Sequence, residues 1–116
     1  MTVTRPLRRA EKDLIAGLLK DSSGTKAIEP SLADAVVQPM DDGGMGSLRF
    51  VYPIEPEQRY CRTIAETMAV DKDGVPLSIT LSVDQRGRLF ELDVWKVDNS
   101  PLKRFPKPAR QKSKTK

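Results

Sequence analysis

The sequence predicts an α+β fold in which one N-terminal helix packs on an antiparallel sheet of about five strands, arranged as a hairpin and a three-stranded meander. Three observations carry this prediction. Residues 7–20 place apolar side chains at spacings of three and four, as an amphipathic helix requires. Residues 77–84 alternate strictly between apolar and polar side chains. Residues 88–98 alternate in a similar way and hold the only tryptophan, Trp95.

The helix is expected to cover the apolar face of the sheet, because no other segment is long enough to do so. Its apolar stripe consists of Leu7, Ala10, Leu14, Ile15, Leu18 and Leu19. Pro6 stands just ahead of it, and Lys20 with the Ser-Ser-Gly at 22–24 marks its end.

The hairpin is expected from two apolar runs, residues 35–40 and 47–52, that flank a glycine-rich segment. The glycines permit the positive φ angles of a turn, and the segment at 41–46 makes the loop of this hairpin longer than the minimal two residues. Pro39 has no N–H group, which indicates that its strand lies at an edge or ends early. The meander then comprises residues 59–70, 77–84 and 88–98, with Ile64, Met68 and Val70 expected on one side of its first strand. Asp-Lys-Asp-Gly at 71–74 is interpreted as a turn.

The last strand shows a change of pattern. Phe90, Leu92 and Val94 are expected on one face, and Glu91 and Asp93 on the other. After Val94, Trp95 and Val97 bring apolar surface to the polar face, so either a bulge rotates the chain or the second face is also covered. We expect covering, with Trp95 in the core, because a tryptophan buries a large surface. An exposed Trp95 would instead indicate a partner site.

Composition bounds the class of protein. With 116 residues, 38% of them hydrophobic, the chain fits one domain at 1–106 followed by a disordered basic tail at 107–116. The net charge is +4, but seven of the twenty basic residues lie in 103–116. The rest of the chain has thirteen basic and sixteen acidic residues, so its net charge is negative. We expect a cytoplasmic protein without membrane contact. The chain has one cysteine, its N-terminus lacks the apolar run of a signal peptide, and no apolar stretch is long enough to span a membrane. Histidine is absent, which excludes Ser-His-Asp and Cys-His catalysis.

Two stretches carry a family resemblance. The first is Pro-Met-Asp-Asp-Gly-Gly-Met-Gly-Ser-Leu at 39–48, and the second runs from Asp-Gly-Val-Pro at 73–76 through Trp-Lys-Val-Asp at 95–98 to Ser-Pro-Leu at 100–102. Together they resemble a family of small bacterial proteins described as a domain of unknown function, over about residues 5–106. The resemblance implies a leucine-rich helix ahead of the glycine loop, and no activity or ligand. Arg8 departs from the serine or threonine expected as helix cap.

The candidate site residues are of four kinds. The first kind is the glycine loop, which consists of Asp41, Asp42, Gly43, Gly44, Met45 and Gly46. This loop is expected to have a conformational role, to contact a partner, or to hold an anion or cation. It lacks the lysine and the following helix of a phosphate loop. Glu91 and Asp93, about 7 Å apart on a strand face, form a solvated face or share a metal or acid-base chemistry. Trp95 lies in the core or in an interface.

The basic tail supplies the fourth kind of candidate, for weak nucleic-acid binding. These residues are Lys103, Arg104, Lys107, Arg110, Lys112, Lys114 and Lys116, and Phe105 is the only aromatic residue near them. The sequence favours a non-enzymatic protein that binds another protein, of adaptor or toxin-neutralising type, without a cofactor. The alternatives are a small enzyme or metal-binding protein using the acidic residues, and a nucleic-acid binder. The oligomeric state stays open.

Overall fold

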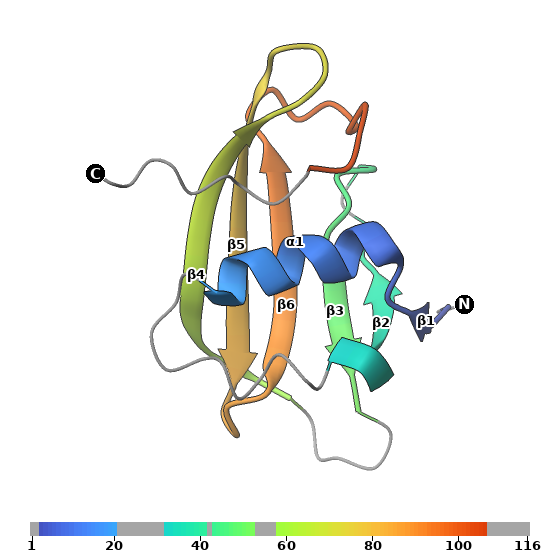
Figure 1. Ribbon diagram of the computed structural model, residues 1–116, viewed down its shortest axis with the longest axis vertical. Helices are drawn as coiled ribbons and strands as arrows, with labels where there is room; N and C mark the ends of the chain where they lie inside the picture. The colour runs from blue at the N-terminus through green and yellow to red at the C-terminus, as the bar shows by residue number, and fades with distance from the viewer. Residues whose placement is uncertain (1–2, 21–31, 42, 53–57, 107–116) are drawn as a thin grey trace.

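The computed structural model describes residues 3–20, 32–41, 43–52 and 58–106. They form one α-helix, α1 (Arg9–Lys20), a single 3₁₀ turn at 32–34, and a sheet. The six strands are β1 (Arg5–Pro6), β2 (Val36–Pro39), β3 (Leu48–Val51), β4 (Tyr60–Val70), β5 (Pro76–Asp84) and β6 (Leu89–Lys96). α1 crosses one face of the sheet (Figure 1). The predicted α+β fold class is confirmed. No helix in the described ranges is long and apolar enough to cross a membrane.

All neighbouring strands are antiparallel, in the order β1-β2-β3-β6-β5-β4. The predicted hairpin is β2–β3 and the predicted meander is β4–β5–β6, and the two join where β3 pairs with β6. The sixth strand, β1, has only two residues and pairs with Val36 and Val37. A segment of two residues shows no alternation, which is why the sequence predicts about five strands. Pro39 lies beyond the reach of β1, where its missing N–H group breaks no pair with that strand.

The core lies between α1 and the sheet. The helix contributes Leu14, Ile15, Leu18 and Leu19, and β5 contributes Leu77, Ile79, Leu81 and Val83, all buried in one cluster. The period of 3.6 on the helix and the period of two on β5 therefore place the predicted side chains on the inner face, with the exception of Ala10, which is exposed.

The N-terminus of α1 is stabilised without a serine or threonine cap. Glu11 accepts a hydrogen bond from the backbone N–H of Arg8 at 2.8 Å, as the glutamate of a capping box does. Arg5 donates two hydrogen bonds of 2.8 Å to the same carboxylate, one to each oxygen. The Glu11 side chain thus joins β1 to the start of the helix and supplies the glutamate half of a capping box.

A bulge changes the face on which Phe90 lies. Ser82 pairs with Glu91 but Val83 pairs with Leu89, so Phe90 is an extra residue in β6. Leu89 joins Leu92 and Val94 in the core cluster, whereas the Phe90 ring lies 4.9 Å from the guanidinium of Arg49. The prediction that Phe90 shares a face with Leu92 and Val94 is therefore wrong. In β4, Met68 and Val70 lie on the outer face and Ile64, at an irregularity, packs against the core.

Beyond Val94 the alternation of β6 continues without a bulge. Ile79 pairs with Val94, Ser78 with Trp95 and Leu77 with Lys96. Lys96 therefore turns into the core and is 0% exposed, while Trp95 is 46% exposed on the outer face. The expectation that both faces are covered and that Trp95 lies in the core is wrong, because the inward position belongs to a lysine.

Candidate functional site

An ion-pair cluster, formed by the buried Lys96 and Asp71 and the partly exposed Asp73, lies at the start of β5 and the end of β6. The Lys96 Nζ lies 2.7 Å from Asp71 Oδ2 and 2.8 Å from Asp73 Oδ2. It also donates to the backbone carbonyl of Pro101 at 3.2 Å. The three N–H groups of the ammonium thus have three acceptors, which is the condition under which a buried charge is tolerated.

Asp71 connects this cluster to three backbone N–H groups. Its carboxylate accepts hydrogen bonds from Lys72 N at 2.6 Å, Lys103 N at 2.8 Å and Arg104 N at 3.1 Å. Burial alone would raise the pKa of Asp71, but the Lys96 ammonium and these N–H groups outweigh burial and hold the pKa well below its ordinary value. One carboxylate therefore fixes both the turn after β4 and the C-terminal segment.

The chemistry of Lys96 is that of a permanent cation. Burial would lower its pKa, but the hydrogen bonds and charges of Asp71 and Asp73 outweigh burial and raise the pKa above its ordinary value. A nucleophilic lysine needs the opposite shift, because only the neutral amine attacks. The geometry and the direction of this shift give Lys96 a structural role.

The glycine loop packs against the C-terminal segment. The Gly44 carbonyl accepts a hydrogen bond from Leu102 N at 3.1 Å. Gly46 has a φ of +90°, and a Cβ atom placed on it would lie 3.0 Å from Leu102 Cδ1 and 3.4 Å from a ring carbon of Phe105. The Sδ of Met45, which is 8% exposed, accepts a hydrogen bond from Lys96 N at 3.4 Å. These contacts explain why glycines stand here.

Ser47, at the end of the loop, is bonded to β6. Its hydroxyl oxygen accepts a hydrogen bond from Val94 N at 2.9 Å and lies 3.2 Å from the Val94 carbonyl and 3.3 Å from Asp93 Oδ1. The two sequence stretches that carry the family resemblance thus contact one another in space. The contacts of Gly44, Met45, Gly46 and Ser47 give this part of the loop a structural role.

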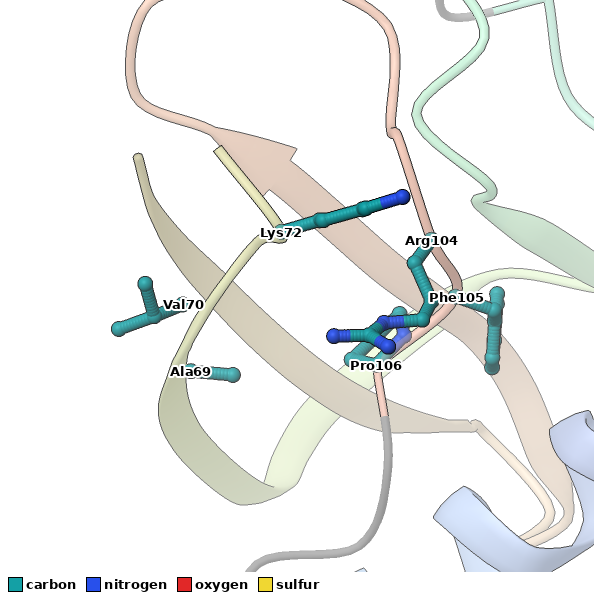
Figure 2. A pocket seen from close by; sticks show the side chains of 6 residues that line it. All are labelled: Ala69, Val70, Lys72, Arg104, Phe105 and Pro106. Atoms are coloured by element: carbon teal, nitrogen blue, oxygen red, sulfur yellow. The ribbon is translucent and has the colours of Figure 1, made fainter. Parts of the chain in front are cut away.

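A small pocket lies at the end of β4, beside the ion-pair cluster. We call it the basic pocket; its cavity of about 230 Å³ is lined by Ala69, Val70, Lys72, Arg104, Phe105 and Pro106. Lys72 approaches from the turn after β4, and Arg104 from the C-terminal segment on the other side (Figure 2). The backbone of both residues is held by Asp71, so their positions relative to one another are set by the buried cluster.

The face of the sheet away from α1 carries apolar side chains at the same end. We call this the apolar patch; it consists of Met68, Val70, Pro76, Trp95 and Val97. Met68 pairs with Ser78 and Ser78 with Trp95, so the methionine and the tryptophan lie in one row across three strands. Val70 pairs with Pro76, whose carbonyl accepts a hydrogen bond from Val97 N at 3.1 Å, and these form the next row.

The acidic candidates are not brought together as a set. Asp41 is exposed in the loop, and Asp42 lies outside the described residues. Glu91 forms an ion pair with Arg49 across the β3–β6 ladder, and Asp93 lies beside Ser47. Over the described ranges no three Asp, Glu or Cys side chains could hold a metal ion.

The remaining sequence candidates divide between the described and undescribed parts of the chain. Arg104 lines the basic pocket, and Lys103 is exposed next to it. Lys107, Arg110, Lys112, Lys114 and Lys116 lie outside the described residues. Sequence reasoning missed Lys96, Asp71 and Lys72. A signal was present for Lys96, since it stands two residues after Val94 at an inward position of an alternating strand.

Comparison with known proteins gives a family and no more. Neither a curated protein nor a solved structure matches the chain. The family described as a domain of unknown function, DUF6984, matches residues 4–106, a range that contains α1, the six strands, the glycine loop and the ion-pair cluster. The predicted family membership is confirmed, and the chain belongs to the DUF6984 family.

Proposed function

We propose that this protein is a non-enzymatic interaction protein of the bacterial cytoplasm, which binds another protein through the apolar patch. The observation that carries the proposal is the exposed row from Met68 to Trp95 on the face of the sheet away from α1. Met68 is 61% exposed and Val70 66% exposed. Clusters of exposed apolar side chains of this kind mark interaction sites.

The composition and stiffness of the patch suit an interface. Tryptophan and methionine are enriched in protein interfaces relative to other surfaces. The Trp95 indole N–H donates a hydrogen bond to Asn99 Oδ1 at 2.9 Å, and Asn99 adopts a left-handed φ of 63° in the turn after β6. Because the indole is already oriented, binding a partner costs little side-chain entropy.

The acidic residues support this class over an enzyme. Glu91 is engaged by Arg49, and Ser47 lies between Asp93 and the backbone of Val94. These contacts hold β3 against β6, so both carboxylates have structural partners. The cytoplasm is supported by the single cysteine, Cys61, which is an exposed free thiol.

Site-specific photocrosslinking in cells tests the proposal. A photoreactive phenylalanine analogue replaces Met68 in one variant and Lys12, on α1, in a control variant. We expect one defined protein adduct from position 68, absent from position 12, and its loss when Trp95→Ala is added to the first variant. Adducts of the same pattern from both positions, or an adduct indifferent to Trp95→Ala, would contradict an interface at the apolar patch. Circular dichroism checks that each variant is folded.

A further inference from the structure

We propose that the open edge of β4 and the basic pocket at its end together accept an extended acidic segment of the partner protein, added to the sheet as a further strand. This inference rests on the proposed function and adds to it the chemistry of the bound segment. Strand addition at a sheet edge is a common mode of peptide recognition, in which backbone groups supply affinity and side-chain pockets supply specificity.

The edge of β4 is suited to pairing. β4 is the last strand of the sheet, has eleven residues and pairs with β5 alone among the described strands. The strand at the opposite edge of the sheet, β1, has only two residues and so offers a much shorter edge. Residues 60–70 contain no proline and no lysine, two residues that commonly block edge pairing.

The regular part of this edge leads into the basic pocket. Pairing with β5 is irregular between Tyr60 and Ala65 but continuous from Ala65 to Val70. An added strand therefore has six regular residues to pair with. These end at Ala69 and Val70, which are themselves part of the pocket lining.

The basic pocket presents two cations that no side chain of the described residues pairs with directly. Within the described residues, neither the Lys72 ammonium nor the Arg104 guanidinium forms a hydrogen bond or ion pair. Both side chains are exposed, and Asp71, which holds the backbone of both, is itself neutralised by Lys96. A carboxylate bound between them would form charge-assisted hydrogen bonds with two side chains whose backbone is already held by Asp71.

The rest of the lining and the chain that follows favour an acidic peptide. Ala69, Val70, Phe105 and Pro106 offer apolar walls for the methylene groups of a glutamate. Residues 107–116 add five basic residues and no acidic one, which attracts a negatively charged segment over longer distances. A single-stranded nucleic acid requires aromatic faces for stacking, and Phe105, the aromatic residue of this pocket, packs against the core.

A random dodecapeptide library, panned on the full chain, tests the inference. We expect the selected peptides to combine apolar residues with aspartate or glutamate. Lys72→Glu with Arg104→Glu should weaken their binding by about tenfold or more. The matched control is Arg9→Glu with Lys12→Glu, which changes the charge equally in the half of α1 away from β4 and should leave affinity unchanged (Figure 1). Amide NMR shifts induced by the peptides should centre on residues 65–72.

Four outcomes would overturn the inference: no enriched peptides, peptides without acidic residues, equal binding to both double variants, or displacement by a single-stranded oligonucleotide at lower concentration than by free peptide. If the selected peptides require Trp95 but tolerate the Lys72 and Arg104 changes, the inference fails while the proposed function stands. If the photocrosslink at position 68 is also absent, both fail.

Discussion

Lys96 and Asp71 form an ion pair in which neither side chain is exposed to solvent, with Nζ 2.7 Å from Oδ2. A charge in a core is costly unless every donor and acceptor is satisfied. Here the pair joins β6 to the turn after β4, and through the remaining bonds of Asp71 it fixes residues 103 and 104 as well. The pair thus links the core to the walls of the basic pocket.

Removing the cation should destabilise the fold strongly. In Lys96→Met the Asp71 carboxylate stays buried without its main counter-charge, so we expect the melting temperature to fall on the order of 10 °C or more. Lys72→Met is the matched control, because Lys72 is exposed and keeps only its backbone bond to Asp71. Its melting temperature should stay within about 2 °C of the parent value. Similar losses in both variants would argue against a structural role specific to Lys96.

Stability should fall at both extremes of pH. The pKa of Asp71 is lowered in the folded state, so its contribution is present above the unfolded pKa of about 3.9 and is lost as pH falls further. The pKa of Lys96 is raised, so its contribution is present below about 10.4 and is lost as pH rises through the folded pKa. Burial raises the pKa of Tyr52 to about 12, which adds to the alkaline loss.

Urea unfolding from pH 2.5 to 7 measures the acid limb. We expect a plateau above about pH 5 and a decline below about pH 4, and a flatter decline in Asp71→Asn, whose side chain does not titrate. If this variant declined as steeply as the parent protein, other carboxylates, with Glu11 and Asp84 the first to examine, would account for the acid limb, since their pKa values are also lowered.

Local periodicity was sufficient to predict most of the fold. The stripe of Leu14, Ile15, Leu18 and Leu19 and the alternation of β5 depend on backbone geometry alone, so each could be read within its own segment. The face of Phe90 could not, because the bulge in β6 is defined by the register with Ser82 and Val83 of another strand. One inserted residue reverses the parity of all positions on one side of it.

The site was harder to predict for the same reason. A lysine at an inward position looks unfavourable until its acceptors are known, and Asp71 and Asp73 come from a turn more than twenty residues earlier in the chain. The pairing of Leu77 with Lys96 brings that turn to the end of β6. The apolar residues Trp95 and Val97 shifted the sequence interpretation toward a covered second face, whereas the residue between them is the one that is buried.

The close approach of the glycine loop to the C-terminal segment can be measured by comparing two glycines. Gly46→Ala places a Cβ 3.0 Å from Leu102 Cδ1, whereas Gly43→Ala meets nothing within 4 Å. Both glycines have positive φ, +90° and +79°, so each substitution carries a backbone cost of about 1 kcal/mol. The steric conflict should make Gly46→Ala less stable than Gly43→Ala by about a further 1 to 3 kcal/mol in urea unfolding. Equal unfolding free energies for the two variants would show that Leu102 can move away from the added Cβ without loss of stability.

Trp95 should report the outer face of the sheet directly, since it is the only tryptophan of the chain. At 46% exposure its emission should be red-shifted and readily quenched by iodide, and Trp95→Ala should cost less than about 1 kcal/mol of unfolding free energy. A buried tryptophan would cost about 3 to 5 kcal/mol on the same substitution and resist quenching. The control is Ile79→Ala in the core, where a loss of about 2 to 5 kcal/mol is expected because Ile79 is 0% exposed.

A Trp95→Ala loss as large as that of Ile79→Ala, with iodide unable to quench, would place Trp95 in the core and remove the apolar patch as an interface. A small loss combined with quenching that is suppressed by the crosslinked partner would locate the interface at the row from Met68 to Trp95.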